Sequence, residues 1–540
     1  MVTVLLATGC CKTIENSGTD KFIFPSIGVA VKDKAVLLAV DDYLLPFRRD
    51  MCYYISKPKV RKEPVLKPDM NDPNSICQLA THFYGTVLFD QGKYRMWYFS
   101  VFLKSRLKHG EPYPGIQIGP NFYAESNDGI HWTKPNLGQV MIDGSRNNNA
   151  IALPGVEVLS PNIIKDEDDP DPARRYKMVY NTWSLIRESK RLPTVRTAVS
   201  SDGINWTAGP ERPVDDFVEQ SSFYKYNDFY FINSQTFERR EGGGFVGRQG
   251  YARISADFDN WIQGPAESFH LPQESPWSDS SGVSVSKASE EVHLGVGAAS
   301  MGNVLVGLYG LWHNRPGPEG SESSGWVSGG TWSDLGLVVS NDGIHFREPV
   351  KGHVFISSKE SEVTPAEGKA YPTILCQSNG IVNVGDETLI YHGRWRNASL
   401  ESLDYYGEVA LATLPRDRWG AVGIIPPLAG HPTTAEGVSE GWVWSAPVRL
   451  PAGGCEIFLN ADDANCITME ISDERFNLLP EFSGEKCGTT SVKSGLDCPV
   501  IWAKSNPAAL GGKTIRLRIN FKKRGDSEPR LYAVYLKAKR

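Results

Sequence analysis

The sequence has almost no stretch with a sustained helical period, and no apolar run long enough to span a bilayer. It also lacks an excess of positive charge, because 57 Lys and Arg stand against 63 Asp and Glu, for a formal net charge of −6. Its nine cysteines show no spacing typical of a zinc site. These absences argue against a helical bundle, a membrane-spanning protein or a nucleic-acid-binding protein. We expect no metal and no cofactor.

What the sequence does contain is a repeated turn. Residues 123–132 have the pattern of a strand, a tight Asn-Asp-Gly turn and an aromatic residue, and a similar pattern with an Asp-Gly step recurs at 198–206 and 338–346 and more loosely at 252–261 and 410–419. An Asp-Gly step allows a tight turn between strands because glycine accepts a positive φ. The closing aromatic residues at 132, 206, 261, 346 and 419 are far enough apart for one four-stranded unit each. We expect these aromatic residues to pack on the neighbouring sheet.

A second strand precedes each turn. These strands are rich in β-branched and aromatic residues with period two, and they cover residues 93–98, 175–180, 228–233, 303–309 and 387–392. Internal repetition of such units predicts a five-bladed β-propeller. The alternative is a β-sandwich in which the Asp-Gly turns recur by coincidence.

The end of the chain has a different character. Alternating strands at 466–471, 514–519 and 530–536 predict a separate β-sandwich. The expected fold class is therefore all-β, with a five-bladed β-propeller over residues 21–435, including a lead-in strand at 35–40, followed by a β-sandwich over residues 436–540. Cys455, Cys466, Cys487 and Cys498 cluster in the sandwich, and disulfides among them cannot be assigned from sequence.

The first twenty residues are expected to be a leader. The segment Ala7-Thr8-Gly9-Cys10 resembles a bacterial lipoprotein cleavage box, although the usual basic residues before the apolar stretch are missing. We therefore expect an exported protein, which is periplasmic, a cell-surface lipoprotein or secreted, with a lipid anchor at Cys10.

Propeller geometry selects candidate site residues. The starts of first strands, the ends of second strands and the starts of third strands converge on one rim. Residues at these places are His82, Tyr84, Ser160, Asn162, Glu219, Trp183, Gln235, Trp312, His313, His392, Arg394, Trp395, Asp334 and Glu408. This mixture of carboxylates, histidines, arginine and tryptophans suits a polar ligand that has a ring face. The competing interpretations are that the aromatic residues pack blades, that the histidines are hydrogen-bonded rim residues, and that the acids pair with neighbours such as Arg394.

In the segment Val218–Tyr230 a glutamate, Glu219, is followed by small residues and an aromatic strand. With the five repeats and the final sandwich, the chain resembles five-bladed β-propeller glycoside hydrolases of the arabinanase/β-xylosidase and invertase/levansucrase clans. The resemblance implies hydrolysis of a poly- or oligosaccharide by an Asp in blade one, an Asp in blade two and a Glu in blade three. One carboxyl group must donate a proton while another, ionised, attacks or activates water. Glu219 matches the blade-three glutamate, and the resemblance makes it the general acid.

The first two acids of that pattern are not in their usual places. The blade-one strand Thr81–Gly85, where an Asp is expected, contains none, and Ser160 stands where the blade-two Asp precedes a proline. Asp72 lies in an Asn-Asp-Pro-Asn segment like that of invertases, but about ten residues before its strand. Asp334 and Glu408 are the expected substitutes.

Three rival functions remain open at this point. The first is a carbohydrate-binding propeller without hydrolysis, and the second is a glycoside phosphorylase, for which His392, Arg394 and Arg396 would form a phosphate pocket. The third is a structural repeat protein that docks another protein. Sequence spacing fixes neither the sugar nor a retaining or inverting outcome.

Overall fold

The computed structural model describes residues 28–69, 77–104, 112, 114–186, 190–210, 218–239, 245–271, 277–278, 284–285, 290–313, 330–427 and 437–539. Cys10 and Asp72 lie outside these residues. Strands dominate the described chain, and its helices are single 3₁₀ turns at η1 (Pro172–Arg174), η2 (Ala464–Cys466), η3 (Gly484–Lys486) and η4 (Pro507–Leu510). None of these described helices is long and apolar enough to cross a bilayer.

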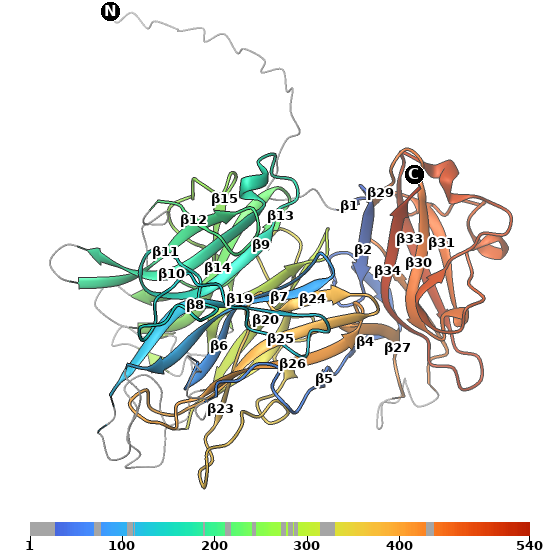
Figure 1. Ribbon diagram of the computed structural model, residues 1–540. Coiled ribbons are helices and arrows are strands. Elements are labelled where there is room, and N and C mark those ends of the chain that lie inside the picture. Colours follow the sequence, from blue (N-terminus) through green and yellow to red (C-terminus); the bar gives the residue numbers. More distant parts are fainter. Residues whose placement is uncertain are drawn as a thin grey trace, which may run out of the picture.

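The first large unit consists of five antiparallel blades, of which blades four, five and one are joined into one twelve-stranded sheet by single parallel bridges (Figure 1). Blade one consists, from the inside outward, of β6 (Ala80–Asp90), β7 (Lys93–Leu103) and β8 (Ile116–Ser126). Blade two consists, in the same order, of β9 (Val156–Lys165), β10 (Tyr176–Ile186), β11 (Lys190–Ser200) and β12 (Thr207–Ala208). Blade three consists of β13 (Glu219–Tyr226), β14 (Phe229–Arg239), β15 (Phe245–Ser255) and β16 (Ala266–Phe269). A separate two-stranded ribbon pairs β17 (Trp277–Ser278) with β18 (Ser284–Val285).

Blades four and five complete the ring. Blade four consists of β19 (Glu290–Ser300), β20 (Leu305–His313), β21 (Trp332–Ser340) and β22 (Val354–Ile356). Blade five consists of β23 (Thr373–Cys376), β24 (Ile381–Val384), β25 (Glu387–Arg396), β26 (Gly407–Pro415) and β5 (Lys59–Val60). In blade five the outermost strand, β5, comes from the start of the chain and pairs with β26. The last blade is thus closed by an early segment.

Hydrogen bonds between the inner strands run all the way round the axis. They join Thr86 Oγ1 to Pro161 O (3.0 Å), Gln220 Nε2 to Ser160 O (3.0 Å), Ser222 Oγ to Val296 O (2.6 Å), Gln377 Nε2 to Gly295 O (2.6 Å) and Val87 N to Asn379 O (2.9 Å). The ring therefore closes after five blades, and the expected fold class, a five-bladed propeller followed by a β-sandwich, is confirmed.

The repeated Asp-Gly turn is held by its own side chains. Asp128 Oδ1 accepts hydrogen bonds from the backbone N–H groups of Ile130 (2.9 Å) and His131 (2.8 Å), and Ser126 Oγ accepts one from Gly129 N (2.9 Å). The same bonds recur at the turns containing Asp202, Asp257 and Asp342. Gly129 has φ +75°, which glycine adopts without steric cost. The third copy lacks the glycine, and Phe258 takes φ +74° there.

The turns also join neighbouring blades. The carbonyl of the turn glycine accepts a hydrogen bond in three of them. These bonds run from Tyr391 Oη to Gly129 O (2.8 Å), from Trp97 Nε1 to Gly203 O (2.9 Å) and from Tyr224 Oη to Gly343 O (2.7 Å). Each donor belongs to the adjacent blade. The ring of Trp132 lies 5.9 Å from that of Tyr391, and Phe346 lies 6.2 Å from Tyr224. For these two turns the predicted packing of the closing aromatic residue on the next sheet is confirmed.

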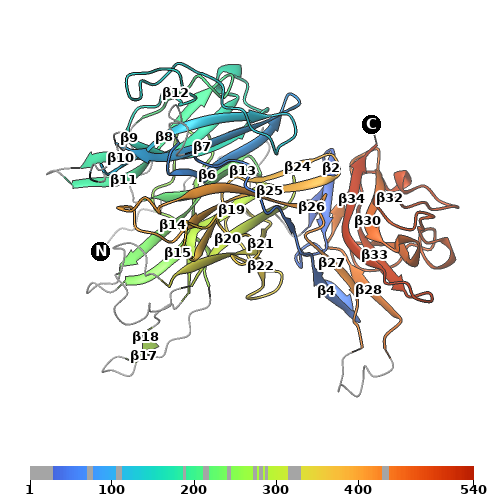
Figure 2. The same cartoon turned by 60° about the horizontal axis from the view of Figure 1, so that its bottom comes forward.

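The second unit is a sandwich of two six-stranded sheets beside the propeller (Figures 1 and 2). One sheet contains β1 (Val29–Ala30), β29 (Val448–Arg449), β33 (Thr514–Lys522), β28 (Glu440–Trp444), β3 (Phe47–Arg49) and β31 (Ile467–Asp473). The other contains β32 (Gly495–Pro499), β30 (Cys455–Asp462), β34 (Arg530–Ala538), β27 (Gly420–Ile424), β4 (Met51–Ile55) and β2 (Lys34–Leu38). The four clustered cysteines of this unit are free thiols.

The predicted boundaries of the two units need correction. The lead-in strand expected in the propeller, β2, pairs with β34 of the sandwich, and β27, which precedes residue 435, belongs to the sandwich too. The physical reason is that Ala35–Leu38 is buried between the two units, in one core that also contains Val304 and Leu335 of blade four. A four-residue apolar run needs cover on both faces, and only the junction supplies it.

Candidate functional site

All five inner strands are irregular at the same level of the ring. Their pairing shifts between His82 and Thr86, at Ser160–Pro161, between Gln220 and Ser222, and between His293 and Val296, and the blade-five strand breaks between β23 and β24. Such bulges re-aim side chains. The residues before the bulges, with the ends of the second strands, form the candidate site described here.

Glu219 is the first residue of β13 and is half-buried. Gln235, opposite it on β14, donates a hydrogen bond from Nε2 to Glu219 Oε2. The amide of Gln235 is oriented in turn, because its Oε1 accepts a hydrogen bond of 2.8 Å from Leu294 N on β19. Blades three and four therefore fix the position of this carboxylate together.

Aromatic rings from three blades line the same end. The ring of Trp395 lies 5.2 Å from His82 and 6.4 Å from Tyr84, and the ring of Trp312 lies 4.6 Å from His293. Burial raises the pKa of the Tyr84 hydroxyl well above its usual value, and the charge of Glu219 adds to this effect. Tyr84 therefore stays protonated near Glu219. Trp395 is half-buried, and its buried Nε1 has no hydrogen-bond partner among the described residues.

The three buried histidines of this region are uncharged at neutral pH. His82 Nε2 lies 2.5 Å from Tyr405 Oη, and burial lowers the His82 pKa to about 3. Burial likewise lowers the pKa of His293 well below its usual value. His392 Nε2 lies 2.7 Å from Ser361 Oγ, and burial lowers its pKa to about 4. These residues provide neutral hydrogen-bonding groups and ring surface.

Sequence reasoning missed an ion pair at the centre of the aromatic group. The guanidinium of Arg248 lies 5.0 Å over the Trp312 ring, and its Nε is 3.5 Å from Glu291 Oε2. Glu291 is the second residue of β19, at nearly the same place in blade four as Glu219 in blade three. Glu291 and His293 are polar residues two positions apart before Gly295, a spacing that could have indicated this inner strand. The strand was missed because no turn signal in the sequence marks where it begins.

Asp334 and His313 form a separate pair in blade four. Asp334 Oδ1 accepts a hydrogen bond of 2.6 Å from Ser358 N, and its Oδ2 lies 3.0 Å from His313 Nε2. Burial alone would raise the Asp334 pKa, but the hydrogen bonds from His313 and Ser358 outweigh burial and lower it. His313 stacks on Trp332 at 4.7 Å. Asp334 is therefore ionised at neutral pH.

Glu408 has a different environment from Glu219. Its carboxylate accepts hydrogen bonds from Arg394 Nε (2.5 Å), Thr364 N (3.0 Å), Thr364 Oγ1 (2.8 Å) and Tyr406 Oη (2.8 Å). Arg394 also donates to Lys62 O at 2.7 Å. Glu408 and Arg394 are both buried. Four donors saturate the two carboxylate oxygens of Glu408, so the Glu408–Arg394 pair holds segments of blade five together. This is the alternative interpretation of the sequence, in which the acid pairs with Arg394.

Two predicted site residues lie outside what the structure describes. Asp72 is not among the described residues, and for Trp183 only the backbone in β10 is described, opposite Pro193. Within the described ranges, no three His, Cys, Asp or Glu side chains gather as a metal site would require.

Comparisons with known proteins give a fold-level likeness. No family model matches the chain. Two curated relatives, uncharacterized proteins Rv1502 and MT1551 of two Mycobacterium tuberculosis strains, are each 30% identical over 193 residues, which is 35% of this chain. The match spans about half the length of these relatives, 53%.

Most of the similar solved structures are described as glycoside hydrolases or glycosidases. A glycosyl hydrolase from Bacteroides ovatus has 16% identity and a TM-score of 0.38, covering 68% of this chain and 95% of that one. The catalytic domain of a Coprinopsis cinerea GH62 α-L-arabinofuranosidase has 10% identity and a TM-score of 0.36 (66% and 97%). A Bombyx mori GH32 β-fructofuranosidase has 12% identity and a TM-score of 0.30 (90% and 93%). Because these TM-scores lie below 0.5, the function is argued below from the side chains of the site.

Proposed function

We propose that the protein is a glycoside hydrolase that cleaves a poly- or oligosaccharide at the end of the propeller where Glu219 lies, with Glu219 as the general acid. The observation that carries this proposal is the half-buried carboxylate of Glu219, held by the oriented amide of Gln235 beside an aromatic wall. A general acid must be near the leaving oxygen and partly shielded from water. The amide of Gln235 can donate to Glu219 whether or not that carboxyl group is protonated.

Glycosidic cleavage needs a second, ionised carboxylate. We assign this role to Glu291, because it is the second residue of the next inner strand and lies three residues before Leu294, which orients Gln235. The guanidinium of Arg248 beside it supplies a compensating positive charge. In a retaining enzyme Glu291 would attack the anomeric carbon, and in an inverting enzyme it would take a proton from the attacking water.

The aromatic wall suits a sugar ring. Trp395 is half-buried, so part of its ring remains accessible, and the C–H face of a pyranose or furanose can stack on such a surface. Polar groups around it are few and fixed, as in binding sites that recognise small polar ligands.

The test compares reducing-sugar release from a broad polysaccharide panel by the wild type, Glu219→Gln and Glu291→Gln. We expect each substitution to lower turnover by at least 100-fold, because acid–base catalysis contributes about 10²–10⁴-fold. The matched control is Glu387→Gln, which changes an exposed glutamate at the opposite end of blade five. Full activity in Glu219→Gln would overturn the assignment of the acid.

The arginine geometry argues against the phosphorylase rival. Arg394 is occupied by Glu408 and Lys62 O, and Arg396 donates to Thr364 O (2.7 Å) and Pro365 O (2.8 Å). These guanidinium groups are committed to the protein and are not available to hold phosphate. Turnover that requires added phosphate would contradict this conclusion.

A carbohydrate-binding propeller without hydrolysis is the second candidate. The observation that favours it is His82, which is buried, neutral and hydrogen-bonded to Tyr405 in the blade-one strand, where the resemblance implies an Asp and the sequence has none. Saccharide binding without reducing-sugar release, in the wild type and in Glu219→Gln alike, would establish this candidate.

A further inference from the structure

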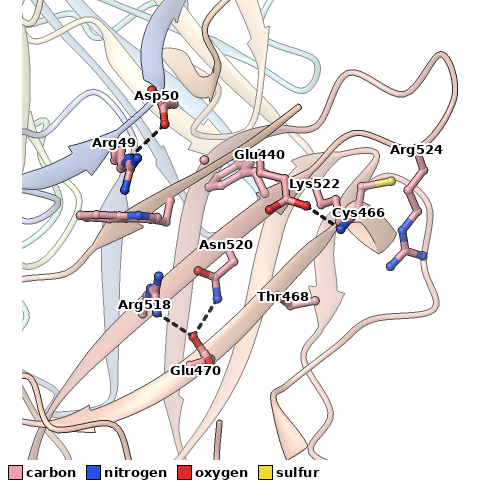
Figure 3. A pocket seen from close by; sticks show the side chains of 13 residues that line it. Arg49, Asp50, Glu440, Cys466, Thr468, Glu470, Arg518, Asn520, Lys522 and Arg524 are labelled. Carbon is pink, nitrogen blue, oxygen red and sulfur yellow. Dashed lines mark hydrogen bonds and ion pairs between the residues drawn. The ribbon is translucent and has the colours of Figure 1, made fainter. Parts of the chain in front are cut away.

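A pocket outside the propeller opens on the outer face of the C-terminal sandwich (Figure 3). Its volume is about 560 Å³, and its walls come from β3, β28, β31, β33 and the loop after β33. In β33 the residues Ile515, Leu517, Ile519 and Phe521 are buried, so the residues between them face outward. The pocket is therefore built by the solvent side of the sheet and not by its core.

The strand register places the lining side chains in rows. Asn520 lies opposite Trp442 on one side and Thr468 on the other, and Trp442 lies opposite Arg49. The next row runs through Phe47, Trp444, Arg518 and Glu470. Each row thus combines an aromatic ring with hydrogen-bonding groups on a rigid sheet.

An aromatic ridge continues the pocket. The ring of Phe476 lies 5.6 Å from that of Phe47 and 5.3 Å from that of Trp444. Phe47 is 48% exposed and Phe476 is 41% exposed. Exposed aromatic side chains grouped beside a polar pocket mark an interaction site.

The pocket also carries one positive charge more than its acids balance. Three carboxylates are paired, Asp50 with Arg49 (3.3 Å), Glu440 with Lys522 (2.5 Å) and Glu470 with Arg518 (3.5 Å). The fourth cation, Arg524, is exposed and has no ion-pair partner among the described residues, and Figure 3 shows it at the edge of the group. In addition, the buried Nε of Arg518 has no hydrogen-bond acceptor in the described part of the chain.

We propose that this pocket binds an acidic saccharide, that is, an oligosaccharide containing a uronic acid. The half-buried Trp442 provides a stacking surface, Asn520 and Thr468 provide hydrogen bonds, and the exposed guanidinium of Arg524 attracts the carboxylate. The local positive charge stands out in a chain whose net charge is −6. This site would hold the polymer while the propeller acts elsewhere on it.

The experiment is calorimetric titration of the full chain carrying Glu219→Gln with tetragalacturonate and with its methyl ester. We expect tetragalacturonate to bind, Trp442→Ala to weaken both ligands at least tenfold, and Arg524→Glu to weaken only the acid at least tenfold. Lys504→Glu, an exposed cation outside the pocket, is the matched control and should change neither.

Two outcomes would overturn the proposal. One is equal affinity of tetragalacturonate for the parent and the Arg524→Glu protein, and the other is no binding at millimolar concentration. Arg524 lies in a loop after β33, so its substitution tests the site even if Trp442→Ala fails to fold. Because binding is read without turnover, the result does not depend on whether the propeller is a hydrolase.

Discussion

At the scale of single residues, three buried histidines tie the stability of the fold to pH. His82, His293 and His392 have pKa values lowered by burial, whereas in the unfolded chain each would titrate near 6.5. Below pH 6.5 the unfolded state therefore binds protons that the folded state does not. The stabilisation is fully present above pH 6.5 and is lost as the pH falls.

We therefore expect the free energy of unfolding to fall by about 4 kcal/mol per pH unit between pH 5.5 and 4.5, since each histidine contributes about 1.4 kcal/mol. Urea unfolding at a series of pH values measures this slope. His392→Gln should reduce it by about a third, and His131→Gln, at an exposed turn, should leave it unchanged. A slope equal in all three proteins would contradict the assignment.

The sequence predicted that His82 starts a first strand and that His392 ends a second strand, whereas His392 lies inside β25, and the sequence could not supply the partner of either residue. Tyr405 is 323 residues from His82, and Ser361 reaches His392 from another segment. Long-range pairs of this kind depend on blade closure, which no local pattern encodes. The same reason hid the partner of Glu291, since Arg248 comes from the neighbouring blade.

At the scale of elements, a buried ion cluster links blades two and three. Asp166 follows β9, and its carboxylate accepts hydrogen bonds from Lys225 (2.7 Å) and Tyr230 (2.5 Å) and lies 3.1 Å from Lys177. Burial would raise its pKa, but these partners lower it to about 2, so it stays ionised at neutral pH. Asp90 repeats the arrangement between blades one and two, with Lys165 at 2.7 Å.

Removing the Asp166 charge should be costly. We expect Asp166→Asn to lower the free energy of unfolding by about 3 kcal/mol, because it removes the buried carboxylate that Lys177 and Lys225 share and leaves each lysine only one, more exposed, acidic partner. Asp168→Asn is the matched control, since Asp168 is 82% exposed and pairs with the same Lys225, and should cost less than 1 kcal/mol. Equal losses in chemical denaturation would show that burial of the pair is unimportant.

The repeated turn makes a second prediction at this scale. A Cβ on Gly129 would lie 2.5 Å from Tyr391 Oη, whereas a Cβ on Gly138, which also has a positive φ, would meet nothing within 4 Å. Gly138→Ala should therefore cost only the backbone strain, about 1–2 kcal/mol. Gly129→Ala should cost about 1 kcal/mol more through loss of the Tyr391 hydrogen bond. Thermal unfolding distinguishes the two variants, and identical midpoints would refute a role for the turn in joining blades.

At the scale of the whole molecule, the sequence predicted both units but not how the chain passes between them. The strand 514–522 was recognisable because one of its faces is buried and the other is not, a pattern that the strand 530–538 follows only in its first half. Strands β2, β3 and β4 were not assignable to the sandwich, because their partners lie several hundred residues later. The chain enters the sandwich, builds the propeller and returns, so the two units share one core.

This shared core depends on a polar clamp as well as on apolar packing. Asp41 is fully buried at the junction, where it pairs with Arg347 of blade four and accepts a hydrogen bond of 2.8 Å from Asn341. Arg347 Nε also lies 2.6 Å from Asp42, which is 60% exposed. Burial raises the pKa of Asp41, and the guanidinium of Arg347 offsets part of that effect.

Arg347→Ala should lower the free energy of unfolding by about 3 kcal/mol, because it leaves Asp41 buried without its cation. Asp42→Ala removes only the exposed partner and should cost less than 1 kcal/mol. Because the apolar core is continuous across the junction, calorimetry should show one transition that shifts as a whole in Arg347→Ala. The contrary result is two transitions in the wild type, only one of which shifts in the Arg347→Ala protein. It would mean that the propeller and the sandwich unfold independently, and that Asp41 stabilises its own unit instead of the junction.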